Sequence, residues 1–289
     1  MKDSSTTTTT TTTTTPPATD DGPVTSESVT VGAVIDAVRA GSPLVHCVTN
    51  TVVANFTANA LLAAGAAPAM VDAPEESGVL ASVAGALLIN LGTVTSAQAD
   101  GMRAAIRGAN AAGVPWVLDP VAIGALPMRT GLAREFAALG PAVIRGNASE
   151  IGALAGGAGG RGVDSTADVA DVALVAAEIA REFGTVVAIS GAVDLITDGT
   201  RTARVSSGTA MLTRVTGVGC SLGALIAACA AVTSDVLMAA AAATSWVCVA
   251  GEEATAASKG AGSFAVGFID ALDLLSANEI AVRSGVSIS

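Results

Sequence analysis

The sequence contains no tyrosine, and aromatic residues make up only 2% of the chain. A protein that binds single-stranded nucleic acid stacks the bases on aromatic side chains, and few are present here. Positive charge is also scarce, because 14 basic residues stand against 25 acidic ones and leave a net charge of −11. Binding to a phosphate backbone needs clustered Lys and Arg. We therefore expect no nucleic-acid partner and a small molecule as the ligand.

Histidine and cysteine are sparse in the same way. His46 is the only histidine, which excludes histidine-rich metal sites and leaves a Ser-His-Asp hydrolase to be built on that one residue. The four cysteines, Cys47, Cys220, Cys229 and Cys248, lie far apart and form no C-x-x-C pair. This spacing fits neither a zinc site nor the disulfide framework of a secreted protein. We expect reduced thiols and a cytoplasmic protein.

Two alanine-rich runs, 220–232 and 236–250, are the apolar segments from which a membrane span would have to be built. Both are short and weakly apolar for that purpose, and Asp235 and Glu252 lie close to their ends. We expect them to be buried helices of a soluble core, with no membrane partner.

The N-terminus lacks the apolar segment that a signal peptide requires, and it contains the unbroken threonine tract Thr6–Thr15. Such low-complexity sequence predicts a disordered tail, which we assign to residues 1–27. Residues 28–289 are enough for one large apolar core, so we expect a single domain there.

The remaining sequence alternates between two patterns. Short apolar runs that end in small or polar residues predict buried strands over 43–50, 86–92, 115–120, 141–147 and 185–191. Helix-length segments such as 96–113 and 165–184 lie between them and close on glycine. This alternation predicts an α/β fold, with a mostly parallel central sheet covered by helices on both faces.

After the fifth predicted strand the pattern changes. Asp198-Gly199 favours a β-hairpin within residues 192–207, and the chain is then expected to be helical to its end. In open α/β sheets the ligands bind beyond the carboxyl ends of the strands. The polar residues that follow each strand are therefore the candidate site residues.

Two acidic residues follow predicted strands. Glu150 completes a capping box with Asn147, and it also suits a role in organising water around Mg²⁺ bound to nucleotide phosphates, with Arg145 adding positive charge nearby. The two roles are compatible. Asp119 is interpreted either as a carboxylate that faces the ligand or as a turn residue before Pro120. Ser190, at the end of another strand, is open to the same two interpretations.

The stretch RVTGVGCSLGA, residues 214–224, places two glycines before an apolar helix. Gly217 and Gly219 let the backbone approach a ligand, and the amides of a helix start converge there, so residues 217–220 predict an anion hole. A helix N-terminus also lowers a thiol pKa, which would suit Cys220 to accept a proton from an attacking hydroxyl. The alternative is a small buried residue at a helix start.

Several motifs occur together and in order. They are PLVHCVTN, FTANALLAAGAAPAM, LLINLGT, WVLDPVAIGA, AVIRGNASEI, GGRGVDST, GVGCSLGA and GAGSFAVGFIDAL. On these motifs, from about Val29 to Asp273, the chain closely resembles hydroxyethylthiazole kinase of the ribokinase-like superfamily. The resemblance implies phosphorylation of 4-methyl-5-(2-hydroxyethyl)thiazole with Mg²⁺ and ATP in thiamine salvage. It further implies a homotrimer with sites at subunit interfaces.

The resemblance also assigns roles to positions of this sequence. Met70 and Gly217 fall where the family contacts the thiazole, and Arg145 and Ser190 fall where it contacts ATP. The anion hole comprises Gly217, Val218, Gly219 and Cys220.

Asp119 and Glu150 match acidic residues associated with magnesium and the phosphates, and Cys220 takes the place of the catalytic base. Three residues depart from the family pattern. Val218 replaces a threonine, Ser190 replaces another, and Ala192 replaces a glutamate.

Two alternatives remain open from the sequence. The chain could be a related ribokinase-like kinase that acts on another small alcohol, such as a hydroxymethylpyrimidine. It could also be a catalytically silent binding or scaffold protein, an interpretation that only the missing acid at Ala192 favours.

Overall fold

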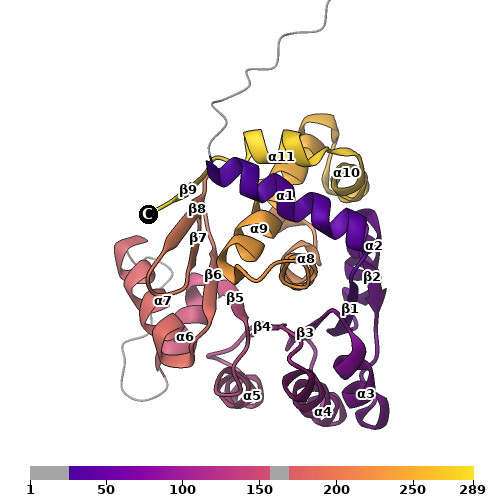
Figure 1. Cartoon of the computed structure of the whole chain (residues 1–289), viewed down its shortest axis with the longest axis vertical. Coiled ribbons are helices and arrows are strands. Elements are labelled where there is room, and N and C mark those ends of the chain that lie inside the picture. Colours follow the sequence, from indigo (N-terminus) through magenta and orange to yellow (C-terminus); the bar gives the residue numbers. More distant parts are fainter. Residues whose placement is uncertain (1–25, 157–168) are drawn as a thin grey trace, which may run out of the picture.

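The protein is built around one β-sheet (Figure 1). The computed structural model describes residues 26–156 and 169–289, and in them the strand order is β2-β1-β3-β4-β5-β6-β7-β8-β9. The strands are β1 (Leu44–Val48), β2 (Ala67–Ala69), β3 (Ala86–Asn90), β4 (Trp116–Asp119), β5 (Val143–Asn147), β6 (Val186–Ser190), β7 (Asp194–Thr197), β8 (Thr202–Val205) and β9 (Val286–Ile288). Neighbours from β2 to β6 are parallel, and β7, β8 and β9 continue the sheet antiparallel.

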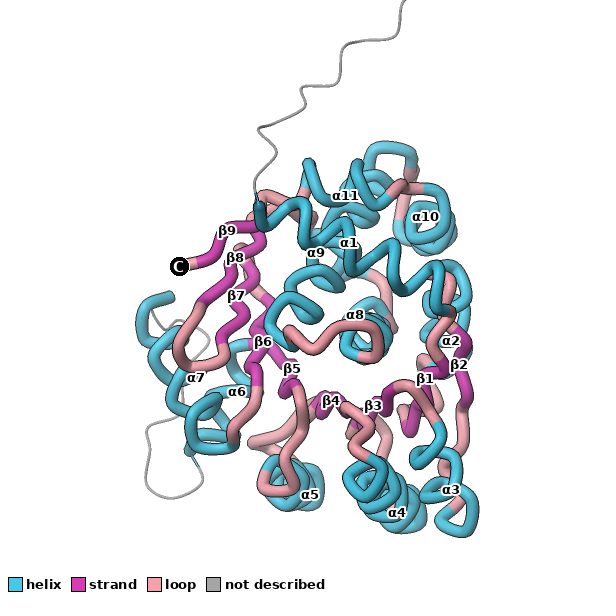
Figure 2. Tube along the Cα trace, viewed as in Figure 1, coloured by secondary structure: helices cyan, strands magenta, loops and turns pink. Residues whose placement is uncertain are grey.

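Helices cover both faces of this sheet, as Figure 2 shows. One face packs against α3 (Pro74–Val83), α4 (Ser96–Ala112), α5 (Pro127–Ala137), α6 (Ala148–Ala155) and α7 (Val169–Phe183). The other face packs against α1 (Ser26–Gly41), α2 (Ala54–Ala63), α8 (Val218–Ala230), α9 (Val236–Ala257), α10 (Ala261–Leu274) and α11 (Ala277–Arg283). The mostly parallel, doubly covered sheet expected from the sequence is confirmed.

Successive side chains along each strand pack alternately into the two apolar cores, one on each face of the sheet. In β3, Leu88 belongs to the core beneath α8 and α9, whereas Leu87 and Ile89 belong to the core beneath α4 and α5. Because both faces are covered, the strand is apolar throughout, as parallel strands usually are. Within the described residues, α9 alone is long and apolar enough to cross a membrane, but 83% of its apolar window is buried in the protein. Its interior position agrees with the expected core helix.

Helix α4 is held to α3 by contact between their backbones. A Cβ added at Gly108 would overlap the carbonyl of Gly78, and one added at Gly101 would overlap the carbonyl of Asp72, just before α3. Glycine is therefore needed at both positions, because any side chain would force the helices apart. This close approach fixes the segment between β2 and α3 against α4.

The five predicted strands are confirmed as β1, β3, β4, β5 and β6. The helix predicted over 96–113 is α4, and its last glycine, Gly113, takes the left-handed conformation with a φ of 70°.

The expectation that the chain is helical to its end is wrong, because β9 pairs with β8 close to the C-terminus. Only its long-range partner makes this three-residue segment a strand, so no local pattern announces it. The division into a tail (1–27) and a domain (28–289) stays a prediction, since residues 1–25 lie outside the described part.

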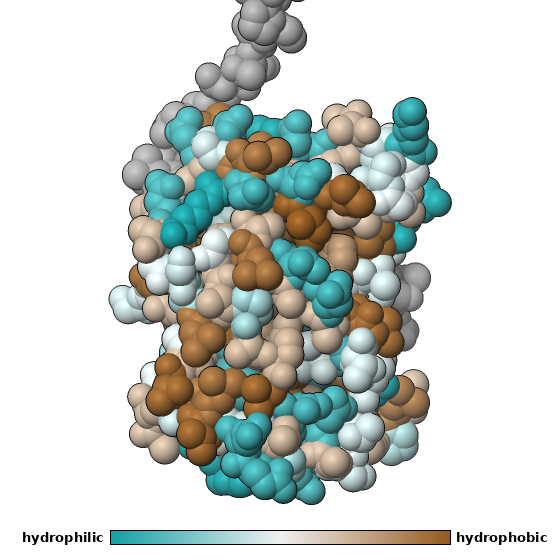
Figure 3. Space-filling model, turned by 90° about the vertical axis from the view of Figure 1, so that its right-hand side faces the viewer, coloured by the Kyte–Doolittle hydropathy of each residue, from teal (hydrophilic) through white to brown (hydrophobic). Residues whose placement is uncertain are grey.

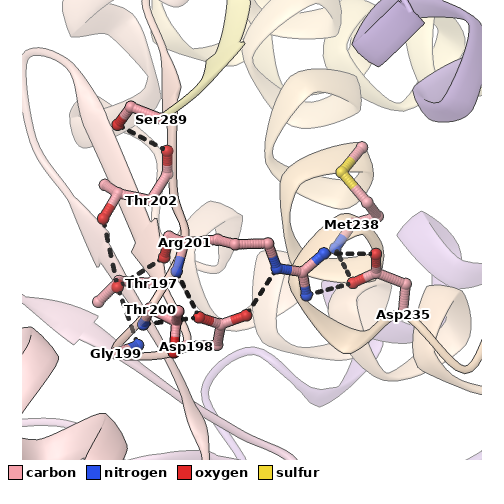
Figure 4. A network of polar contacts seen from close by, with 9 residues as sticks. All are labelled: Thr197, Asp198, Gly199, Thr200, Arg201, Thr202, Asp235, Met238 and Ser289. Atoms are coloured by element: carbon pink, nitrogen blue, oxygen red, sulfur yellow. Dashed lines mark hydrogen bonds and ion pairs between the residues drawn. The ribbon is translucent and has the colours of Figure 1, made fainter.

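The predicted hairpin is present as β7 and β8, and Figure 4 shows how its turn is fixed. Asp198 accepts hydrogen bonds from the amides of Thr200 and Arg201. The guanidinium of Arg201 then bridges Asp198 and Asp235, at 2.8 Å from a carboxylate oxygen of each. Asp235 also caps α9 by accepting from the amide of Met238. The hairpin is thereby tied to the start of the helix it packs against.

Candidate active site

The glycine-rich segment 214–224 forms the start of α8. The helix begins at Val218, two residues before Cys220. Gly217 caps it in the left-handed region, with a φ of 98°. A Cβ there would also lie 2.9 Å from Cδ1 of Phe56. Position 217 therefore needs glycine for its backbone and for its close packing. The first amides of a helix have no acceptor within it, so residues 217–220 present the donors that an anion hole requires.

Arg145 lies beside this helix start and links two other strand ends to it. A Cβ at Gly219 would lie 3.2 Å from Nη1 of Arg145, so the guanidinium rests against the first turn of α8. Its Nη2 donates a hydrogen bond of 2.9 Å to Ser190 Oγ. Its Nη1 lies 3.6 Å from Asp119 Oδ1. The structure thus brings the sequence-predicted residues Arg145, Ser190, Asp119 and the α8 start together.

Asp119 is a fully buried carboxylate at the end of β4. Its Oδ2 accepts a hydrogen bond of 2.7 Å from Asn90 Nδ2, while Oδ1 has no hydrogen-bond partner. Burial raises the pKa of Asp119 to about 6, and this effect outweighs the opposing attraction of Arg145. The negative charge of Glu150 pushes the pKa in the same direction as burial. A buried carboxylate with one oxygen that accepts no hydrogen bond, although Arg145 lies 3.6 Å from it, is suited to binding a cation.

The Cys220 thiol lies next to this carboxylate and receives a hydrogen bond from Asn50 Nδ2 at 3.4 Å. Burial and the charge of Asp119 raise its pKa, although Asn90, Asn50 and Arg145 act in the opposite direction. The sequence argument that the helix start lowers this pKa is therefore not supported. Desolvation of a thiolate, together with a neighbouring carboxylate, opposes the helix dipole.

Two asparagines that the sequence analysis missed connect these groups. Asn90 Oδ1 accepts from Asn50 Nδ2 and from the amide of Gly92, each at 2.9 Å. With Asn90 donating to Asp119, a chain of amides joins the carboxyl ends of β1, β3 and β4 to the Cys220 thiol. Their positions in the sequence could have indicated them, because both asparagines come at the end of an apolar strand or just after one. Asparagine alone, however, is common in such turns.

Glu150 forms the capping box that the sequence predicts. Its Oε2 accepts from the Asn147 amide, and its own amide donates to Asn147 Oδ1, both at 2.9 Å. Its Oε1 accepts from the Ala122 amide, also at 2.9 Å. The capping interpretation is confirmed. In this position the negative charge of Glu150 still raises the pKa of Asp119.

A cavity of about 720 Å³ opens beside Arg145, Ser190 and Gly219. The backbone around residues 207–210 and the α9 residue Cys248 line it as well. The loop after β6, including Ala192, forms another part of the wall. Ala192 contributes no carboxylate to that part, and the acidic side chain beside it is that of Asp194.

A second pair that the sequence analysis missed lies in the wall of the same cavity. Asp194 Oδ1 accepts from the Gly191 amide at 2.8 Å, and the Cys248 thiol donates to Asp194 Oδ2 at 3.2 Å. Burial raises the pKa of Asp194 and that of Cys248. The pair fixes the turn that follows Ser190.

Met70 directly follows β2, at the same edge of the sheet as the other strand ends, and 37% of its surface is exposed. It takes no part in the hydrogen-bonded chain described above. Segment 159–166, which carries one of the motifs quoted above, lies outside the described residues.

Comparison with known proteins gives a consistent result. The family model for the hydroxyethylthiazole kinase family matches residues 35–278. A hydroxyethylthiazole kinase of Clavibacter sepedonicus is 54% identical over 267 residues, which cover 92% of this chain and 97% of that protein. One from Cronobacter sakazakii is 55% identical over 240 residues, which cover 83% and 91%.

Solved structures agree with the sequence relatives. The structure of a hydroxyethylthiazole kinase protein from Pyrococcus horikoshii superposes with a TM-score of 0.82 and 40% identity, covering 90% of this chain and 98% of that one. An ADP complex of Bacillus subtilis pyridoxal kinase superposes with a TM-score of 0.56 at 19% identity, covering 73% and 92%, which shows a shared fold.

The buried charge of Asp119 predicts a dependence of stability on pH. Its pKa is raised from 3.8 to about 6, so the native state holds the proton to higher pH than the unfolded chain. Stability is lost as the pH rises through this window. Asp119→Asn removes the effect, so its stability relative to the native protein should grow by roughly 3 kcal/mol between about pH 3.5 and about pH 8. Thermal or urea unfolding at the two pH values measures it.

The control for this measurement is Asp198→Asn. The pKa of Asp198 is lowered by hydrogen bonds from Arg201 and Thr200 that outweigh burial, although burial is the largest single influence on it and acts the other way. This variant should therefore lose relative stability as the pH rises toward the ordinary carboxyl pKa, and its relative stability should stay constant above that pH. A parallel trend for the two variants would contradict the buried-charge argument.

Proposed function

This chain belongs to the hydroxyethylthiazole kinase family, and we propose how its residues divide the work of that reaction. The enzyme transfers the γ-phosphoryl group of ATP to the hydroxyl of 4-methyl-5-(2-hydroxyethyl)thiazole. A kinase of hydroxymethylpyrimidine is not favoured, because the curated relatives named above carry the thiazole activity over nearly the whole chain. The observation that carries the proposal is the meeting of Arg145, Asp119 and Cys220 at the start of α8.

The phosphates of ATP are bound at the α8 start. The amides of residues 217–220 and the positive end of the helix attract the transferring phosphoryl group. Arg145, packed against the same turn, supplies a full positive charge to the oxygens. Ser190 orients Arg145 and borders the cavity that receives the rest of the nucleotide. Phosphoryl transfer depends mainly on this positioning and charge stabilisation.

Cys220 accepts the proton of the substrate hydroxyl. As the substrate oxygen forms its bond to the γ-phosphorus, the bond to the ADP oxygen breaks, and the proton passes to the Cys220 thiolate. The raised pKa of Cys220 means that little thiolate is present at neutral pH. The Asn50 amide stabilises that thiolate by donating a hydrogen bond to it. Gly217, packed against Phe56, and Met70 contact the thiazole ring.

A magnesium ion accompanies ATP, and Asp119 is the residue that best fits it. Its Oδ1 is buried without a hydrogen-bond partner, and carboxylate oxygen is a preferred magnesium ligand. No cluster of three metal-ligating side chains occurs in residues 26–156 and 169–289. This suits Mg²⁺, which retains water and phosphate ligands. When bound, the ion would neutralise phosphate charge, and Glu150 would act on it through water.

The protein is proposed to be a cytoplasmic homotrimer. The four cysteines are all free, as a reducing compartment requires. Figure 3 shows apolar patches on the side of the molecule formed by α2, β2, α3 and α10. Exposed apolar residues of these elements include Leu62, Val79, Val83 and Val266, each at least 59% exposed. Covering such a surface favours association.

Variants of Cys220 test its role as a base. Cys220→Ala and Cys220→Ser should keep the fold but lower kcat for the thiazole alcohol by roughly 10²–10⁴, the usual contribution of a positioned base. Cys220→Asp should stay active. Because the native thiol has a raised pKa, kcat/KM of the native enzyme should rise with pH above neutral, and Cys220→Asp should lose that rise. An active Ala variant together with an unstable Asp variant would contradict this role.

The assay for these variants also tests the substrate. The native protein is incubated with Mg·ATP and a panel of thiazole, pyrimidine and sugar alcohols. Turnover of another alcohol without turnover of the thiazole alcohol would overturn the substrate assignment.

Glu150→Gln tests the charge near the metal. The amide retains one acceptor for the capping contacts but removes the negative charge, so activity should fall steeply and recover partly at high Mg²⁺. The matched control is Glu279→Gln, which alters an equivalent capping box in α11. Equal losses of stability in both variants, with turnover unchanged, would leave Glu150 a capping residue only.

The apolar side is tested by sedimentation. Paired substitutions of Val79 and Val266 by Glu should convert a trimer into monomer, because charge in a buried contact is costly. Leu174→Glu on α7, at the opposite side of the molecule in Figure 1, should leave the trimer intact. A native protein that sediments only as monomer at micromolar concentration would refute the assembly.

A further inference from the structure

The short segment between β2 and α3 carries Met70, yet nothing in the site described above holds it. Its residues are Met70, Val71, Asp72 and Ala73, which we call the Met70 loop. The only histidine of the chain, His46, contacts this loop and has no part in the reaction proposed above.

His46 lies in the middle of β1, paired with Ala69 of β2 and Leu87 of β3, and it is fully buried. Its neighbours Cys47 and Val48 belong to opposite cores, so the alternation of the strand places the imidazole on the side of α3 and α4. From there Nε2 lies 2.6 Å from the carbonyl oxygen of Val71.

This contact settles the chemical form of the ring. A carbonyl oxygen only accepts, so Nε2 carries the hydrogen and donates it. The Nδ1 atom is buried and has no hydrogen-bond partner. An unpaired polar atom in a core costs free energy, whereas a leucine of similar size would not incur that cost. Stability alone therefore does not account for a histidine here.

The rest of the Met70 loop is anchored around the same carbonyl. Ser77 Oγ approaches the Val71 carbonyl at 3.3 Å and donates to the Ala73 carbonyl at 2.8 Å. Gln98 Nε2 donates to Asp72 Oδ2 at 3.1 Å. Gly101 of α4 leaves room for the Asp72 carbonyl directly above it. Val71, Asp72 and Ala73 are therefore each held by contacts with β1, α3 or α4. Met70 directly precedes these three fixed residues.

We propose that His46 is a positioning residue for the acceptor substrate: its hydrogen bond to the Val71 carbonyl sets the height and direction of Met70 at the edge of the sheet. The proposal rests on the proposed contact of Met70 with the thiazole. It assigns no part of the phosphoryl transfer to His46, because the ring is buried on the α3 and α4 side while the α8 start lies on the other face.

The test compares His46→Leu with His46→Gln. Leucine fills the space without a donor, whereas glutamine can place an amide donor toward the same carbonyl. His46→Leu should raise KM for the thiazole alcohol by about tenfold, with KM for ATP and kcat within about twofold of native, since one positioning hydrogen bond is lost. His46→Gln should restore KM to within about threefold of native. The melting temperature of His46→Leu should not fall.

Two control variants separate the possible failures. Cys47→Ala removes a buried side chain from the same strand on the opposite face, and it should lower stability without changing either KM. Met70→Ala should raise KM for the thiazole alcohol. Amide hydrogen exchange of peptides covering residues 70–76 should be faster in His46→Leu than in Cys47→Ala, independently of any activity.

The outcomes are decisive in each case. A change in both KM values, a fall in kcat alone, or exchange of residues 70–76 equal to that of Cys47→Ala would overturn the proposal. If Met70→Ala leaves KM unchanged, the thiazole contact of Met70 fails, and the exchange measurement alone then decides whether His46 fixes the loop. If His46→Leu does not fold, His46→Met, which also fills the space without a donor, takes its place with the same expected changes.

Discussion

The ion pair between Arg145 and the buried Asp119 is the constraint on which the site depends. The pair lies at the carboxyl ends of β4 and β5, under the first turn of α8, and it fixes all three elements relative to one another. Its separation of 3.6 Å leaves one carboxylate oxygen unsatisfied. Burial then keeps the pKa of Asp119 near neutrality rather than well below it. The protein thus maintains at its centre a charge distribution that a bound nucleotide and its ion would complete.

The same electrostatic arrangement explains why a thiol can serve beside a carboxylate. Two full negative charges close together in a desolvated site repel each other. With Cys220 neutral at rest, Asp119 carries the only negative charge of this pair, opposite the positive charge of Arg145. In the proposed role of Cys220 as a base, a thiolate is needed only while the proton moves. The amides of Asn50 and Asn90 mediate between the two groups, donating one hydrogen bond to each. In the proposed role of Cys220, little thiolate is present at neutral pH, and the site avoids a second buried negative charge beside Asp119.

Much of this was predictable from sequence because it depends on local pattern. Five of the six parallel strands were predicted from apolar runs, and the α8 start from glycines before an apolar helix. The three-residue strand β2 was not predicted. The capping box of Glu150 follows from spacing alone.

The features that could not be predicted depend on contacts between distant segments. Asn50 reaches Cys220 across 170 positions, and Cys248 reaches Asp194 across 54. The pKa of Cys220 is raised, contrary to the local expectation, because the thiol is buried and because the charge of Asp119, from another strand, lies beside it. Strand β9 exists only through its pairing with β8.

The backbone contact between α3 and α4 has a consequence for how substrate preference can change. Because Gly101 and Gly108 leave no space for a side chain, a methyl group at either position acts as a wedge inserted from beneath the sheet edge. At Gly101 the wedge would press on Asp72, two residues from Met70, and at Gly108 it would press on α3 at Gly78. If Met70 contacts the thiazole as proposed, a substitution at Gly101 would alter the shape of the acceptor pocket from the α4 side. Substitution of Gly101 or Gly108 is therefore a route to other alcohol substrates that changes no residue in contact with the substrate.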